Sequence, residues 1–145
     1  MPAATYTHVA LAEQPIDVVW DRLQSAETWS TIGPVDAVWD AVHENELLRS
    51  YRWRTTIGPT SYAGTARVVA SERPRRMQLL LDAREVAGTL TTELHARSEA
   101  ATEIAVTLEV VSRGMLSTLF FPVVSEAVGN GLPEQVDTFA ATFSH

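Results

Sequence analysis

The residues that could carry chemistry in this 145-residue chain are few and scattered. Its four histidines, His8, His43, His95 and His145, have no spacing that would bring two ring nitrogens to one metal ion. The chain has no cysteine and no lysine, which excludes a thiolate nucleophile, cysteine-bound metals and a Schiff-base lysine. We therefore expect no bound metal and no cofactor.

Carboxylates gather around the second predicted strand, at Asp36, Asp40, Glu44 and Glu46. Two of them could form an acid/base pair, but a solvated strand edge explains the group better. The chain also has no Ser-His-Asp order, nucleophile elbow, phosphate-binding loop or dinucleotide fingerprint. No catalytic motif follows from these residues.

Aromatic and polar side chains at inward positions of the predicted strands are stronger candidates. Tryptophan and tyrosine combine a large apolar surface with one polar atom, which suits them to orient a planar or partly polar ligand. Arg49 falls on the same predicted strand face as Tyr51 and Trp53. It is a candidate anchor for a carboxylate or enolate at the mouth of a cavity, and the alternative, which the strand-end position favours, is a surface residue. The full set is Trp39, Arg49, Tyr51, Trp53, Tyr62 and Thr92.

These side chains lie in segments in which apolar and polar residues alternate, and this alternation predicts strands. In strand after strand one face is apolar and the other polar, so we expect an antiparallel sheet that is solvated on one side and covered on the other. His95 falls on the polar face, whereas His8 could face either way. The alternating segments are 5–11, 35–42 with an ambiguous register, 47–57, 61–70, 77–84, 88–97 and 103–110.

Helical patterns flank the strands. Pro15 opens an amphipathic segment that runs to Leu23, with Trp29 in a second short helix. Apolar residues recur at steps of three and four from Leu116 to Phe143, which predicts a long helix that covers the sheet. Glycines and Pro133 predict a kink or break in this helix near residues 129–133.

Composition and charge narrow the class of protein. The chain is 46% hydrophobic and 20% charged, and it has the length of one domain, so we expect a single domain over residues 1–145. No apolar run is long enough for a membrane span, and no signal peptide is evident, so a cytoplasmic location is expected. A net charge of −7 disfavours nucleic acid as a partner. The oligomeric state stays open, with a homodimer as one expectation.

Together these features resemble the START-like superfamily, also called SRPBCC, which includes polyketide cyclase/dehydrase-like proteins and has the helix-grip fold. The resemblance rests on the first strand, the Pro15–Leu23 helix with Val18, Val19 and Trp20, then Trp29, the corner at Glu72–Met77 and the last strand at Thr102–Val110. It implies an α+β fold. A curved antiparallel sheet of six or seven strands would wrap around the C-terminal helix, with two short helices after the first strand.

The resemblance also implies a cavity between sheet and helix that binds a small hydrophobic molecule, aromatic polyketide-like or lipid-like. The first alternative is a polyketide aromatase/cyclase or dehydratase, in which Arg49, Tyr51 or Tyr62 polarises a carbonyl and assists loss of water. The second is a partner-binding module of the ATPase-activator type. The expected ligand contacts are Trp39, Tyr51, Trp53, Tyr62, Met77, Leu79, Leu90, Thr92, Val106, Phe120, Val124, Val128 and Leu132.

Overall fold

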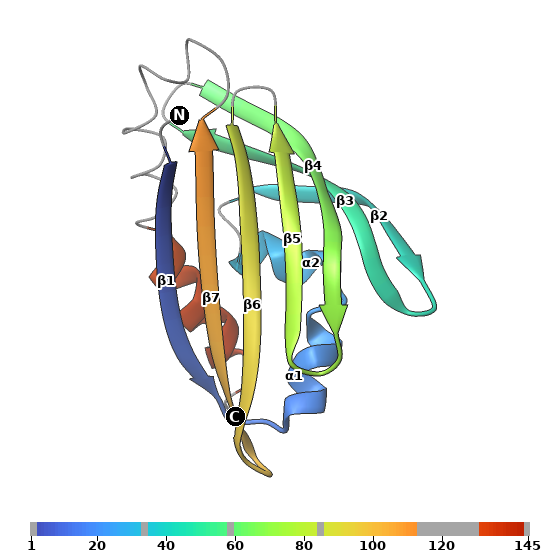
Figure 1. Ribbon diagram of the computed structural model, residues 1–145, viewed down its shortest axis with the longest axis vertical. Coiled ribbons are helices and arrows are strands. Elements are labelled where there is room, and N and C mark those ends of the chain that lie inside the picture. The colour runs from blue at the N-terminus through green and yellow to red at the C-terminus, as the bar shows by residue number, and fades with distance from the viewer. Residues whose placement is uncertain (1–2, 33–34, 58–59, 84–85, 113–130, 144–145) are drawn as a thin grey trace.

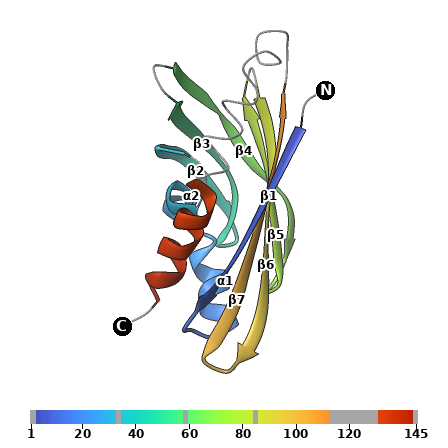
Figure 2. The same ribbon diagram turned by 90° about the vertical axis from the view of Figure 1, so that its left-hand side faces the viewer.

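Seven antiparallel strands form one curved sheet, and helices pack against one of its faces (Figures 1 and 2). The structure is a computed structural model that describes residues 3–32, 35–57, 60–83, 86–112 and 131–143. The strands lie in the order β1-β7-β6-β5-β4-β3-β2. Their bounds are β1 Ala3–Ala12, β2 Ala37–Glu44, β3 Leu47–Ile57, β4 Thr60–Glu72, β5 Arg76–Ala83, β6 Val86–Ser98 and β7 Ala101–Ser112.

Side-chain alternation divides the sheet into an apolar inner face, which the helices cover, and a polar outer face. On β5, for example, Met77, Leu79 and Leu81 are buried while Asp82 is exposed. Strand register aligns the inner residues in rows, because β5 and β7 both pair with β6. Each fully buried Leu contributes about 1.5–3 kcal/mol relative to an exposed one, so this face carries much of the stability.

Two short helices follow β1, as the sequence predicts. Helix α1 (Ile16–Arg22) contacts β6 and β7, and helix α2 (Ala26–Ile32) contacts β2. The sequence predicts Pro15 as the first helical residue, whereas it lies at the N-cap, one position before Ile16, and its carbonyl oxygen accepts the amides of Val18 and Val19. Trp20 and Trp29 have no exposed surface, so both belong to the core.

The C-terminal helix covers the inner face beside α1, in red in Figure 2. The chain is helical over 131–141, and Leu132, Val136 and Phe139 are buried. The kink predicted near 129–133 falls partly on 129–130, which lie outside the described residues. From residue 131 the helix continues through Pro133.

Polar contacts fix the helices to the sheet and to each other. In the β4–β5 turn, Arg73 donates to Asp21 of α1 over 3.0 Å. The guanidinium of Arg22 lies 4.7 Å from the centre of the Phe143 ring, a cation–π contact that joins α1 to the turn after the C-terminal helix. On β1, Nε2 of His8 lies 2.8 Å from Oδ1 of Asp137, so His8 faces inward.

This architecture confirms the predicted α+β helix-grip fold: a curved antiparallel sheet of seven strands, short helices after β1 and a C-terminal helix. His95 lies on the outer face as predicted. In the strand register it stands opposite Glu103 of β7. Within the described residues, no helix has both the length and the apolar character needed to cross a membrane.

Gly64 is required by the packing of β4. A methyl group there would overlap the backbone oxygen of Asp82 and lie 2.8 Å from Cζ2 of Trp53. We predict that Gly64→Ala lowers the free energy of unfolding by about 1–3 kcal/mol, the usual cost of overpacking a core. Urea unfolding followed by tryptophan fluorescence measures this change.

Gly88→Ala is the matched control, because the nearest atom to its added methyl, the backbone oxygen of Glu109, is 3.3 Å away. Gly88→Ala should lower the free energy of unfolding clearly less than Gly64→Ala does. Equal losses of stability in the two variants would contradict the packing described at Gly64.

Candidate functional site

The inner face of the sheet brings together most of the residues predicted to contact a ligand. Met77, Thr92 and Val106 form one row across β5, β6 and β7, and all three are fully buried. Leu79 and Leu90 lie in the next row, opposite each other on β5 and β6. These five residues make a continuous apolar wall that contains one hydroxyl group.

That hydroxyl belongs to Thr92 and is the most unusual feature of the wall. Its Oγ1 atom is buried and has no hydrogen-bond partner among the described residues. Leaving a buried hydroxyl unpaired costs about 1–3 kcal/mol. Nε1 of Trp20, from α1, is also buried, and it too has no hydrogen-bond partner among the residues that the structure describes. The inner side of the sheet therefore holds two fully buried polar atoms that have no hydrogen-bond partner among the described residues.

Tyr51 lies on β3, where its inward position is opposite the fully buried Ala66 of β4. Burial raises the pKa of the Tyr51 phenol above its ordinary value because the phenolate would lose its hydration. At neutral pH the hydroxyl therefore stays protonated. It can donate a hydrogen bond to a carbonyl oxygen, but it cannot act as a base.

Trp53 and Tyr62 extend the wall across β3 and β4. The Trp53 ring lies over Gly64, and its Nε1 donates to the carbonyl oxygen of Thr65 over 2.9 Å. This hydrogen bond fixes the ring orientation. Tyr62 is half-buried and packs against the core. Trp53 therefore offers a rigid apolar surface, whereas Tyr62 lies nearer solvent.

The inward position predicted for Trp39 is wrong. Trp39 pairs with Arg52, and its neighbour Val38 pairs with the inward Trp53, so Trp39 shares the outer face and is 39% exposed. Residues that lie directly opposite each other in an antiparallel pair point to the same side. The ambiguous alternation along 35–42 concealed this register.

Strand parity also fails at Arg49. Val42 pairs with Ser50 but His43 pairs with Leu48, so Arg49 is the extra residue of a β-bulge. The bulge lets Leu48 and Tyr51 both be buried although their positions differ by three. Nε of Arg49 is buried and has no partner among the described residues. Because the bulge breaks the two-residue alternation here, the position of Arg49 two residues before Tyr51 does not show that Arg49 belongs to the apolar wall.

Gln24, between α1 and α2, organises the end of the inner face and had no distinguishing signal in the sequence. Its Oε1 accepts the amide of Leu48 over 3.0 Å, and its Nε2 lies 3.4 Å from the carbonyl oxygen of Trp20 and 3.9 Å from the Met77 sulfur. The carboxamide thus connects α1, β3 and β5. Its role is to position the wall.

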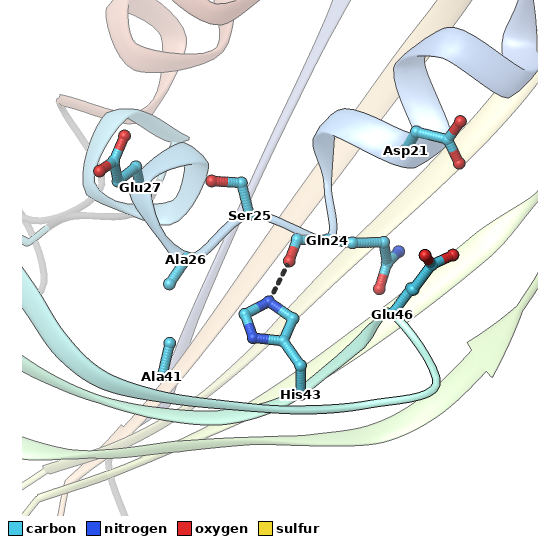
Figure 3. Close-up of a pocket in the computed structure, with 8 residues that line it drawn as sticks. All are labelled: Asp21, Gln24, Ser25, Ala26, Glu27, Ala41, His43 and Glu46. Atoms are coloured by element: carbon cyan, nitrogen blue, oxygen red, sulfur yellow. Dashed lines mark hydrogen bonds between the residues drawn. The ribbon is translucent and has the colours of Figure 1, made fainter.

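An open groove of ≈ 470 Å³ lies on the other side of Gln24, between the α1–α2 connection and β2 (Figure 3). His43 donates from Nε2 to the carbonyl oxygen of Gln24 over 2.8 Å, because a carbonyl oxygen only accepts. The groove also presents carboxylates, so its chemistry differs from the apolar wall. Its lining is Asp21, Gln24, Ser25, Ala26, Glu27, Ala41, His43 and Glu46.

The C-terminal helix supplies Leu132, whose side chain is almost completely buried. The other predicted helix contacts, Phe120, Val124 and Val128, lie outside the described residues. Within the described ranges, no group of three or more His, Asp or Glu residues is arranged to hold a metal ion. The chemistry available on the described inner face is apolar contact plus hydrogen bonding from a few buried polar atoms.

Comparison with known proteins shows similarity at the level of structure. No protein-family model and no curated protein sequence matches the chain. A solved structure from Thermus thermophilus superposes with a TM-score of 0.73 at 11% identity, covering 98% of this chain and 100% of that one. A START superfamily protein from Mycobacterium smegmatis has a TM-score of 0.63 at 12% identity, covering 91% and 98%.

The Zhui aromatase/cyclase from a Streptomyces strain has a TM-score of 0.64 at 16% identity, covering 99% of this chain and 87% of that one. Similarity at these identities defines the fold and leaves activity undetermined. The chain therefore has the START-like, helix-grip fold, as its sequence resemblance indicated.

The raised pKa of Tyr51 leads to a prediction about alkaline stability. In the unfolded chain the phenol ionises near its ordinary pKa of about 10, whereas in the folded chain it stays protonated. The unfolded state then binds fewer protons, so stability is lost as the pH rises above about 10. Tyr51→Phe removes this dependence.

We expect the free energies of unfolding of wild type and Tyr51→Phe to keep a constant difference at neutral pH. Above about pH 10 the wild type should fall relative to the variant, by up to about 1.4 kcal/mol per pH unit. Urea unfolding at increasing pH measures the two curves. Curves that stay parallel into this range would contradict burial of the hydroxyl.

Proposed function

We propose that the protein binds a small hydrophobic molecule against the inner face of the sheet, of an aromatic polyketide-like or lipid-like type. The observation that carries this proposal is the unpaired hydroxyl of Thr92 in a wall of Met77, Leu79, Leu90 and Val106. Ligand sites are mostly apolar surfaces with a few polar groups that fix orientation, and this wall has that composition.

The ligand should carry an oxygen atom on a mainly apolar skeleton. Thr92 can donate to or accept from such an atom, and Tyr51, which stays protonated, can donate to it. Apolar burial would supply most of the affinity, at about 25 cal/mol per Å² of apolar surface removed from water. Trp53 and Tyr62 would contact a planar part of the ligand, and Leu132 would cover it from the side of the C-terminal helix. Phe120, Val124 and Val128 stay expected contacts from the sequence.

Thr92→Val tests this proposal because it removes the hydroxyl and keeps the shape of the side chain. Without ligand, the variant should be more stable than wild type by about 1 kcal/mol, since an unpaired buried hydroxyl is replaced by a methyl group. With ligand, it should bind oxygen-containing compounds less tightly by about tenfold, the value of one hydrogen bond.

Naphthol and naphthalene are suitable probes, because they differ by one hydroxyl group. Quenching of tryptophan fluorescence gives the dissociation constants of both for wild type, Thr92→Val and the control Thr89→Val, which changes the outer face of the same strand. The proposal predicts that only Thr92→Val lowers the preference for naphthol. Equal preferences in all three proteins, or no binding of either probe, would contradict it.

A further inference from the structure

The two edges of the sheet are built differently. Strand β2, at one edge, has register shifts between Trp39 and Val42 and between Val42 and His43. Asp40 adopts a left-handed backbone conformation with φ 54°. Its side chain and that of Glu44 add negative charge to this edge. Bulges and charges are the usual devices that stop an edge strand from pairing with another chain.

Strand β1, at the opposite edge, has neither a bulge nor a charged residue among its own residues, and no other described strand pairs with its outer side. Its ten residues, Ala3–Ala12, pair with β7 in one unbroken register. They include no proline, no acidic residue and no arginine or lysine. Val9 and Leu11 point outward and are 50% and 55% exposed. A long, regular and uncharged edge presents a row of backbone donors and acceptors that can pair with another strand.

We propose that β1 pairs in antiparallel fashion with β1 of a second copy of this chain, so that the sheet continues across a homodimer. Charge favours this edge over the edge formed by β2. Each copy carries a net charge of −7, so two copies repel, and the uncharged strand β1 adds less local repulsion than β2, which carries Asp40 and Glu44.

The difference between the edges also decides the type of assembly. Pairing of β1 with β2 of another copy would be head-to-tail and would build a ring or a filament. The bulges and carboxylates of β2 oppose that contact. Pairing of β1 with itself uses the same surface on both copies and closes at two chains. A dimer is therefore the assembly that this sheet permits.

A two-fold axis through Thr7, near the midpoint of β1, determines which residues of the two β1 strands lie opposite each other. It places Val9 of one copy opposite Thr5 of the second copy, and Leu11 opposite Ala3 of the second copy. The exposed apolar side chains then gain neighbours across the new strand pair, and no charged side chains of β1 face each other. One strand pair buries less than the ~1,600 Å² of a standard interface, so we expect a reversible dimer that depends on concentration.

Val9→Lys tests the proposal by sedimentation velocity over a range of protein concentrations. Val69→Lys is the control, because Val69 is 48% exposed at an irregularity of β4, away from both edges. Both substitutions reduce the net negative charge equally, so general repulsion falls by the same amount in each. The proposal predicts at least a tenfold weaker dimer for Val9→Lys and an unchanged dimer for Val69→Lys.

Hydrogen exchange of the wild-type protein gives a second measurement that needs no variant. Backbone amides of β1 should gain protection as the protein concentration rises, and amides of β2 should not. A wild-type protein that stays monomeric overturns the proposal, as does a dimer that Val9→Lys and Val69→Lys weaken equally. Concentration-dependent protection that spares β1 also overturns it.

Discussion

The apolar inner face of the sheet is the constraint on which the rest of the structure depends. Seven strands place Leu, Met, Val and aromatic side chains on one side, and this side must be removed from water for the sheet to be stable. Helix α1 and the C-terminal helix are present on that side, and Arg22 and His8 fix them through contacts with Phe143 and Asp137. The connection between α1 and α2 is held by Gln24.

Within this apolar face, a few polar atoms depart from what stability alone would favour. Thr92 Oγ1 and Trp20 Nε1 are buried without partners among the described residues, although valine or phenylalanine in their places would avoid the cost. Proteins that violate a packing rule usually do so at functional sites. The proposed binding function accounts for these atoms, because a ligand oxygen could pair with them.

The sequence predicted the elements well, because strands of a half-buried antiparallel sheet alternate with period two. Tyr51, Trp53, Met77 and Leu79 were placed on the inner face by this period alone, and they lie there. The resemblance to START-like proteins supplied the curvature of the sheet around the C-terminal helix, whereas the strand order comes from the structure alone. That architecture depends on long-range pairing, which a local pattern does not specify.

Residues beside the bulges could not be placed from the sequence. A bulge adds one residue to one strand, and this reverses the side to which later residues point. Arg49 is the extra residue of such a bulge, so the alternation failed there, whereas Trp39 was misplaced because both faces of 35–42 carry apolar residues. Gln24 was missed for another reason: a single polar residue after a short helix resembles an ordinary surface residue, and only its tertiary partners reveal its role.

The central claim is that the inner face of the sheet binds a small hydrophobic molecule. Native mass spectrometry of the freshly purified protein tests it most directly, because non-covalent complexes with apolar ligands can be detected without knowing the ligand in advance. Ligand binding at the inner face should give a mass above that of the chain, by an amount equal to one small organic molecule, which disappears after denaturation. A protein that shows only the mass of its chain, and still takes up no hydrophobic probe, would rule this binding out.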